Sequence, residues 1–383
     1  MKLTFLLMNF TEITFEVILL GLAAFFLLIQ IFYFVFFFFR LAFHKEQKID
    51  SQSLPPISII VAARSEAHNL VEFLPYLFEQ NYPEFEVVVV NDRSWDDTKE
   101  ILKAFQLKYS NLHVVNIEET NHKSNGKKMA VTLGIKGAKY EHLALTDADC
   151  KPVSQNWLMS IGMKFQNTDT KIVLGYSPFK KEKGFLNSLI RFDGFWVALQ
   201  YLSFAKAGKP YMGVGRNLAY TKNDFFKIGG FKKHYNLKSG DDDLFVNEIA
   251  NHRNTAVVLN EDSHVQTLPK TTWEHWSVQK KRHFTTAPLY KFSHRFWLSL
   301  WPLSLGLFYI SVVLLLVLNK FLLITLVLLA VRTLFLILTF TRAGKWLGQK
   351  DIVWLAFFYE GLFLFIYPFL YLTGNNRKSE KWI

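Results

Sequence analysis

Two carboxylates one residue apart end an apolar stretch in the middle of the chain. Residues 143–146 are Leu-Ala-Leu-Thr, and Asp147 and Asp149 follow directly. If the apolar run is a buried strand, both carboxylates point to the same side as the chain leaves the sheet. Two like charges so placed repel each other unless a cation lies beside them, and carboxylate oxygens suit Mg²⁺ or Mn²⁺. The pattern favours a divalent metal able to hold a diphosphate, with a solvated Asp-rich turn as the alternative.

Four further polar clusters could take part in the same chemistry. They are Asn91-Asp92, Gly126-Lys127-Lys128, Asp241-Asp242-Asp243, and Gln279 with Arg282. A carboxylate can remove a proton from an attacking hydroxyl, and crowding three of them should raise the pKa of at least one. Lysine and arginine suit phosphate oxygens. Each cluster also has an ordinary reading: a carboxylate near a helix start, a solvated lysine pair, an acidic helix N-terminus and a surface helix face.

The elements that would position these residues alternate between strand and helix. The expected strands are residues 57–61, 87–90, 112–115 and 143–146, and the expected helices are 67–80, 96–109 and 126–139. Such an alternation predicts an α/β domain with a mostly parallel sheet covered by helices on both faces. Ligands of these sheets bind at the carboxyl ends of the strands, where Asp92 and Asp147 are expected.

Composition separates this domain from both ends of the chain. The 383 residues are 50% hydrophobic, with 38 Phe, and the aromatic residues crowd toward the two ends, which favours a membrane protein. The net charge of +12 suits a nucleic acid, an anionic lipid surface or a phosphorylated substrate. The apolar ends favour lipid, so we expect no nucleic-acid partner. A single cysteine, Cys150, excludes an intramolecular disulfide and fits a reducing cytoplasm.

The apolar ends predict membrane spans. Residues 15–39 are long enough to cross a bilayer and too long for a signal peptide, and Arg40, Lys45 and Lys48 then place the following domain in the cytoplasm. Three more spans are expected at about 296–318, 321–340 and 352–372. A third C-terminal crossing would put the basic tail outside, against the positive-inside rule, so the last stretch could instead be re-entrant.

Two charges lie inside the C-terminal apolar stretches. Arg332 lies eight residues before Phe340, and Glu360 lies eight residues after Ile352. With a rise of about 1.5 Å per residue, both charges lie at the same depth in adjacent antiparallel helices. Because unpaired charges are costly in a membrane, we predict that Arg332 pairs with Glu360. A lipid headgroup or a watery cavity facing Arg332 is the alternative.

An aromatic-rich segment connects the two parts of the sequence. Residues 185–204 could form a helix at the membrane surface, a helix beside a substrate channel, or an ordinary core helix.

Taken together, the order and spacing of these clusters resemble the membrane-bound family-2 glycosyltransferases, which are inverting enzymes with a GT-A nucleotide-sugar domain. The likeness covers roughly residues 56–288. It implies a membrane anchor at 1–40, a linker at 41–55, a GT-A domain at 56–290 and a transmembrane region of about three spans at 291–383. Two positions depart from the family pattern: Ser65 stands where Asn is usual, and His283 stands where the Gln-x-x-Arg-Trp motif has Trp.

The resemblance assigns roles residue by residue. It implies that the nucleotide sugar is bound by Ala63, Arg64, Glu66, Asp92, Lys127, Lys128, Asp147, Gln279 and Arg282. It implies that Asp149, with Asp147 shared between ribose and metal, coordinates Mg²⁺ or Mn²⁺. It implies that Asp242 is the catalytic base, with Asp241 as a substitute.

The expected protein is therefore a metal-dependent glycosyltransferase of a bacterial inner membrane, with its catalytic domain in the cytoplasm. We expect a UDP-sugar donor and a lipid or membrane-associated glycan acceptor. A processive polysaccharide synthase and a catalytically silent membrane scaffold are the alternatives. The sequence says nothing about oligomeric state.

Overall fold

The computed structural model describes residues 14–45, 53–118, 126–237 and 239–374. Most of the predicted linker, residues 46–52, and the basic tail after Gly374 lie outside the described residues.

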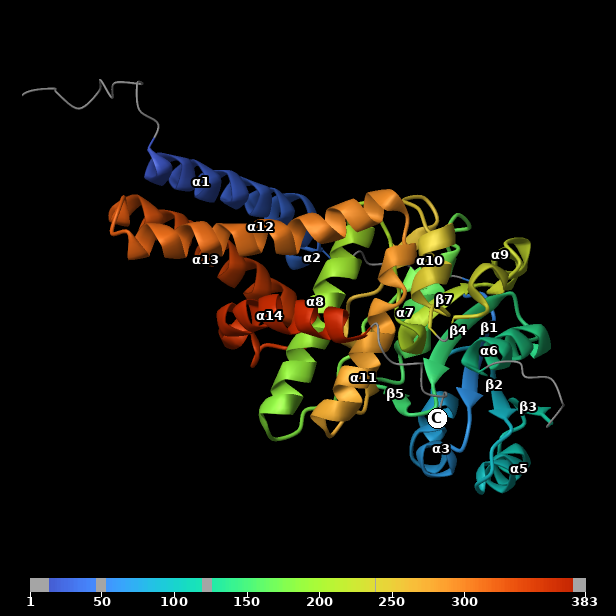
Figure 1. The fold of residues 1–383 in the computed structure, drawn as a ribbon. Helices are drawn as coiled ribbons and strands as arrows, with labels where there is room; N and C mark the ends of the chain where they lie inside the picture. The colour runs from blue at the N-terminus through green and yellow to red at the C-terminus, as the bar shows by residue number, and fades with distance from the viewer. Residues whose placement is uncertain (1–13, 46–52, 119–125, 238, 375–383) are drawn as a thin grey trace, which may run out of the picture.

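A mixed sheet forms the centre of an α/β domain (Figure 1). Its strand order is β3-β2-β1-β4-β7-β6-β8, and the first four strands of this order are parallel to one another. The described strands are β1 Ile57–Ala63, β2 Phe85–Asp92, β3 Leu112–Ile117, β4 His142–Asp147, β6 Ile172–Leu174, β7 Leu218–Thr221 and β8 Thr255–Val257. A two-stranded sheet pairs β5 Cys150–Pro152 with β9 Val265–Thr267. The predicted α/β fold with a mostly parallel sheet is confirmed.

Helices cover both faces of this sheet because its strands are apolar on both sides. Along β1, Ile59 and Val61 pack into one core, and Ile60 packs into the core on the opposite face. The helices of the domain are α3 Ala67–Phe73, α4 Pro75–Phe78, α5 Thr98–Lys108, α6 Gly126–Gly137, α7 Trp157–Phe165, α9 Lys222–Lys227, α10 Asp243–Ile249 and α11 Trp273–Phe284. The predicted helix 67–80 is divided into α3 and α4 at Pro75, since proline lacks the N–H that would continue the ladder.

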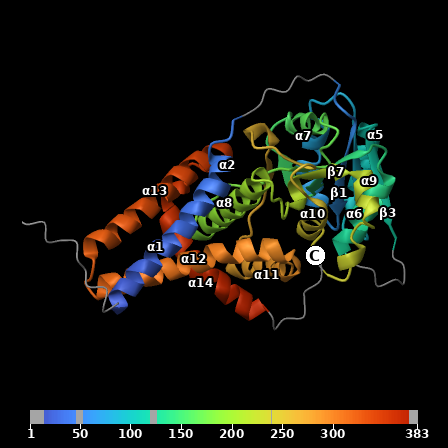
Figure 2. The ribbon, with the colours of Figure 1, turned by 90° about the horizontal axis from the view of Figure 1, so that it is seen from above.

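In the part of the chain that the structure describes, four helices are long and apolar enough to cross a membrane. The first runs through α1 Phe15–Tyr33, a π-helical turn η1 Phe34–Phe38 and α2 Phe39–Ala42. The others are α12 Phe292–Val317, α13 Leu322–Trp346, and η6 Val353–Leu355 continued by α14 Ala356–Gly374. Asn319 and Phe321, both with positive φ, turn the chain between α12 and α13. In Figures 1 and 2, α1, α12 and α13 lie side by side and extend away from the sheet domain.

Helix α8, Phe185–Lys206, lies between the sheet domain and the apolar helices (Figure 2). Most of its side chains are buried. Its Phe204 ring stacks on Phe37 of the anchor at 4.0 Å, and its Phe192 ring contacts Phe363 of α14 at 5.9 Å. The aromatic-rich segment is therefore a core helix that joins the sheet domain to the long apolar helices.

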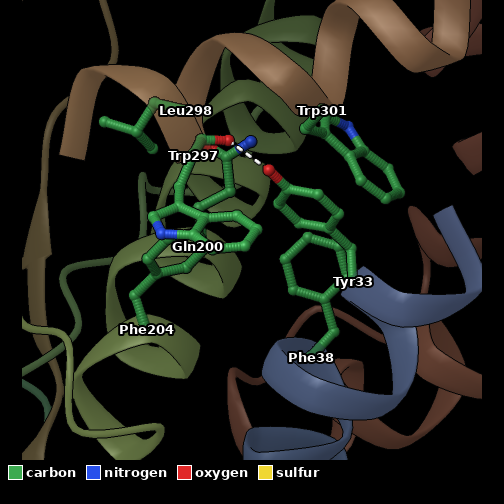
Figure 3. A pocket seen from close by; sticks show the side chains of 7 residues that line it. All are labelled: Tyr33, Phe38, Gln200, Phe204, Trp297, Leu298 and Trp301. Atoms are coloured by element: carbon green, nitrogen blue, oxygen red, sulfur yellow. Dashed lines mark hydrogen bonds between the residues drawn. The ribbon is translucent and has the colours of Figure 1, made fainter. Parts of the chain in front are cut away.

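Aromatic side chains also fix the anchor against α8 and α12. Figure 3 shows a small, tightly packed pocket between these three helices, lined by Tyr33, Phe38, Gln200, Phe204, Trp297, Leu298 and Trp301. The Tyr33 hydroxyl donates to the Trp297 carbonyl. This joint holds the anchor in a defined position relative to α8.

The charges inside the apolar helices meet as predicted. The Arg332 guanidinium of α13 is fully buried and pairs with the Glu360 carboxylate of α14. It also donates to Gln30 of α1 at 2.7 Å and to the Tyr309 hydroxyl of α12 at 2.8 Å. The predicted ion pair is confirmed, and Arg332 joins all four apolar helices.

Candidate functional site

The predicted site residues gather where the strand order changes direction. From β1 the chain builds the sheet outward through β2 and β3, and then returns to place β4 on the other side of β1. Such a switch point leaves a crevice at the carboxyl ends of the two strands. Ala62 pairs with Asp147 across β1 and β4, and Ala63 pairs with Asn91 across β1 and β2. The nucleotide-binding and metal-binding candidates therefore lie at one edge.

The loops after β1 and β2 are joined by hydrogen bonds. Ser65 N donates to Ser94 Oγ at 2.8 Å, and Glu66 N donates to Thr98 Oγ1 at 3.0 Å. Ser65 has a φ of 53°, a conformation that Asn tolerates better than most residues, which accounts for Asn at this position in the family pattern. Ser65 instead uses its hydroxyl, which accepts from Trp95 N at 3.4 Å.

Arg64 and Glu66 face the edge from this pair of loops. The Arg64 guanidinium lies 5.6 Å from the centre of the exposed Trp95 ring. Burial raises the pKa of Glu66, and Asn69 Nδ2 donates to its carboxylate at 2.5 Å.

Asp92 is fully buried at the end of β2. Its Oδ1 accepts from Arg93 Nε at 2.7 Å, and its Oδ2 has no partner among the described residues. Asp92 does not cap α5, because that helix begins at Thr98 and Asp96 accepts from Thr98 N. The alternative of a capping carboxylate therefore applies to Asp96, and the predicted base-binding role of Asp92 stays a prediction.

Lys127 lies between the two acidic clusters. Its Nζ is 2.6 Å from Asp147 Oδ1 and 3.4 Å from Asp241 Oδ2. Burial raises the pKa of Asp147, but Lys127, Arg216 and Arg282 together outweigh this effect and hold that pKa below its usual value. The first turn of α6 thus places Lys127 between the Asp-x-Asp segment and the acidic triplet.

Asp149 lies in a different environment from Asp147. Burial and the neighbouring Asp147 raise the pKa of Asp149, and among the described residues no basic side chain lies within ion-pair distance of it. Oxygens of Asp147 and Asp149 and the sulfur of Cys150 lie within 4.8 Å of one another. Burial also raises the pKa of the Cys150 thiol, so the two carboxylates are the donors that fit Mg²⁺ or Mn²⁺.

The three carboxylates of the acidic triplet have different partners. Asp243 is buried and accepts from the hydroxyls of Thr286 at 2.5 Å and Tyr290 at 2.7 Å. Asp242 caps α10, accepting from Asp243 N at 2.8 Å, and its other oxygen accepts from Gly215 N at 2.8 Å. Burial and the charges of Asp241 and Asp243 raise the pKa of Asp242 to about 7. A carboxyl group with such a pKa suits proton transfer near neutral pH.

Lys128 points away from its neighbour Lys127. Its buried ammonium donates to the backbone carbonyls of His234, Leu237 and Ser239 at 2.6–3.0 Å. All three N–H donors of the ammonium have partners here. Lys128 thus stabilises the loop that leads into the acidic triplet, while Lys127 contacts the carboxylates.

The Gln279–Arg282 segment lies on α11, which Thr272 caps by accepting from His275 N. The Arg282 side chain is exposed, and its charge contributes to the lowered pKa of Asp147. Gln279 is half-buried, and His283 is exposed beside Arg282. The segment therefore approaches the Asp-x-Asp edge from the side of the membrane helices.

Arg216 is a site residue that the sequence analysis did not assign. Its Nε donates to Ser177 Oγ at 2.8 Å, and its guanidinium lies 5.1 Å from the centre of the Phe179 ring. Its charge counters the effect of burial on the pKa values of both Asp147 and Asp149. The sequence signal for Arg216 was its position after the Gly-Val-Gly segment at residues 213–215.

Comparisons with known proteins agree with this geometry. Residues 58–231 match the model of the family "Glycosyl transferase family 2". Glycosyltransferase AglE of Haloferax volcanii is 31% identical over 200 residues, which are 50% of this chain and 60% of that protein. Glycosyltransferase GlyG of Streptococcus pneumoniae is 29% identical over 156 residues, 40% of this chain and 50% of that protein. The matched region therefore spans only part of these relatives.

A solved structure shows the same fold over nearly the whole chain. The mannosyltransferase PcManGT of Pyrobaculum calidifontis superposes with a TM-score of 0.57, covering 90% of this chain and 98% of that one, at 18% identity. This likeness supports the GT-A fold. Residues 58–231 are thus similar to family-2 glycosyltransferase domains, on a scaffold with the GT-A fold.

Proposed function

We propose that the protein is an inverting, metal-dependent glycosyltransferase that moves a sugar from a nucleotide sugar to a lipid or membrane-associated acceptor. Its catalytic domain would face the cytoplasm at a bacterial inner membrane. A UDP-sugar is the proposed donor. The position of Lys127 carries the proposal, because one ammonium contacts Asp147 of the metal-binding candidates and Asp241 of the acidic triplet.

In this reaction the donor diphosphate would replace contacts that Lys127 makes with Asp147 and Asp241. Lys127, Arg216 and Arg282 place positive charge around Asp147 and Asp149, where the diphosphate would bind. Arg64 and Trp95, with Asp92 and Glu66, would hold the base and ribose at the ends of β1 and β2. Guanidinium groups suit the developing charge on phosphate oxygens.

Asp149 and Asp147 would hold Mg²⁺ or Mn²⁺, which when bound neutralises charge on the departing diphosphate. The donor set supports this assignment, because Asp149 lacks a basic partner within ion-pair distance among the described residues and its pKa is raised. PcManGT, which shares the fold, was solved with GDP-mannose and Mn²⁺.

Asp242 would remove the proton of the acceptor hydroxyl. The acceptor oxygen then forms a bond with the anomeric carbon, the bond from that carbon to the diphosphate oxygen breaks, and the proton stays on Asp242. The pKa of about 7 lets Asp242 accept a proton at neutral pH and release it later. Asp241, which faces Lys127, is the substitute base.

A binding experiment tests the donor class and the site together. Purified protein is heated with Mn²⁺ and each of UDP-glucose, UDP-N-acetylglucosamine and GDP-mannose. One nucleotide class should raise the unfolding temperature, and Asp149→Ala should abolish that increase. No increase and no metal-dependent turnover with any of them would favour the non-catalytic scaffold.

A processive polysaccharide synthase is the second candidate. The poly-beta-1,6-N-acetyl-D-glucosamine synthase of Staphylococcus epidermidis is 33% identical over 102 residues, which are 24% of that protein. Product size separates the two candidates: a ladder of polymer would replace the single-transfer proposal.

A further inference from the structure

Both ends of the α14 segment contact the catalytic domain. Before the helix, the Asp351 carboxylate accepts two hydrogen bonds from the Arg191 guanidinium of α8, at 2.7 and 3.0 Å. Gln349 Oε1 accepts a third from the same guanidinium at 2.7 Å. The chain that leaves α13 is thus held on the domain side.

The other end of α14 returns to the same side. The Phe284 ring of α11 contacts the rings of Tyr367 and Tyr371 at 5.5 and 6.4 Å. A Cβ atom built on Gly374 would lie 3.5 Å from Lys281 Cγ. Figure 2 likewise places the end of α14 beside α11.

If α14 crossed the membrane from its start near Arg191 of α8, its last turn could not lie beside α11. The 19 residues of α14 extend about 28 Å, close to the hydrocarbon thickness of about 30 Å. Since α12 leaves the domain and α13 returns, a crossing α14 would carry Gly374 to the far side. Between its ends, however, α14 reaches the apolar layer, where Glu360 pairs with Arg332.

We infer that α14 does not cross the membrane. It is an uninterrupted helix that begins and ends on the catalytic side and lies against α8, α11 and α13.

A buried polar contact joins this helix to the Gln279–Arg282 segment. The Lys280 ammonium lies 2.9 Å from Asp193 Oδ1 of α8, and the Tyr367 hydroxyl of α14 donates to the same oxygen. Lys280 and Asp193 are 7% and 4% exposed, so losing one partner leaves a buried charge poorly compensated. Lys280, Asp193 and Tyr367 are therefore positioning residues that set α11, and with it Arg282, against the diphosphate site. This second part rests on the proposed function.

Cysteine labelling from the two sides of the membrane tests the path of α14. Thr373→Cys, at the exposed end of α14, should react with a membrane-impermeant maleimide from the same side as Lys99→Cys, on the exposed face of α5. Asn319→Cys, at the α12–α13 turn, should react from the opposite side. Unchanged protein, whose Cys150 is buried, is the control for background labelling. Labelling of Thr373→Cys from the same side as Asn319→Cys would overturn the inference, whether or not the protein transfers sugar.

Nucleotide binding tests the positioning role. With Mn²⁺ and either UDP or GDP, Asp193→Asn and Tyr367→Phe should each weaken binding about 3- to 30-fold, since misplacing a binding group costs affinity. The matched control is Tyr371→Phe, which removes a tyrosine hydroxyl one turn further along α14 and should leave nucleotide binding unchanged. Tyr367→Phe keeps the ring contacts, so it stays informative if Asp193→Asn does not fold.

The pattern of results separates the two proposals. Equal affinities in unchanged protein and Tyr367→Phe, with Arg282→Ala weakened, would overturn the positioning role alone. No nucleotide binding by unchanged protein would overturn the proposed function, while the labelling experiment would still decide the path of α14.

Discussion

Two cations in this molecule make similar contacts in opposite surroundings. Lys127 touches two carboxylates from different elements, and its side chain is 25% exposed. Arg332 also joins different elements, through Glu360, Gln30 and Tyr309, and it is fully buried. A partly exposed pair can exchange partners with an incoming ligand, whereas a fully buried pair is held by the cost of leaving a charge unpaired. We therefore expect the first to serve binding and the second to serve assembly.

The acidic triplet beside Lys127 should give the largest effect on catalysis. Asp242→Asn should lower kcat/KM about 10²- to 10⁴-fold, the usual contribution of a general base. A fall of that size in Asp241→Asn with little change in Asp242→Asn would assign the base to Asp241 instead. Both are measured at saturating Mn²⁺.

The same Asp242→Asn change should stabilise the folded protein. A carboxyl whose pKa is raised on folding binds its proton more tightly in the native state, so its ionisation costs stability as pH rises from about 4 toward 7. Above pH 7 the variant should therefore unfold at a higher temperature than the unchanged protein. A lower unfolding temperature at pH 8 would contradict a raised pKa at this position.

Changes to the buried Arg332–Glu360 pair should lower the stability of the protein instead of raising it. Arg332→Leu and Glu360→Leu should each destabilise the protein by about 3–5 kcal/mol, because each leaves the other charge buried without its partner. The double change should cost less than the sum of the two. Unfolding temperature and yield of membrane-inserted protein measure this, and additive losses would contradict a functional pairing.

Neighbouring lysines give a smaller, matched comparison. Lys127→Met should lower kcat/KM about 10²-fold with little loss of stability, because a charge near the diphosphate is removed. Lys128→Met should leave buried carbonyls of the 234–239 loop unsatisfied and cost about 1–3 kcal/mol of stability. If the two variants exchange these effects, the assignment of Lys127 to the donor site is wrong.

Sequence patterns predicted the features that depend on local order. The strands and their carboxyl-end residues followed from apolar runs that end in Asp92 and Asp147. The Arg332–Glu360 pair could be predicted because the rise of a helix is regular, so positions counted from the helix ends give the depth of each charge. The division of work between Lys127 and Lys128 could not be predicted, since it depends on a loop more than 100 residues later. Arg216 was missed for the same reason, because its contacts with Ser177 and Phe179 depend on the tertiary fold.

The pH dependence of kcat/KM should respond to a change at Lys127 and not to a change at the Arg332–Glu360 pair. Asp242 must be deprotonated to act as the base, so kcat/KM should rise about tenfold per pH unit up to a midpoint near 7 and then level off. This rise in kcat/KM reports the titration of the coupled carboxylates as a group rather than of Asp242 alone. Lys127→Met should move the midpoint of the rise to higher pH, because the Lys127 ammonium favours the ionised form of Asp242. Glu360→Leu, far from this cluster, should leave the midpoint where it is. Rates with Mn²⁺ and the donor that binds most tightly, measured between pH 5.5 and 8.5, check this. A rise that survives unchanged in Asp242→Asn would mean that a different group sets the protonation state of the active enzyme.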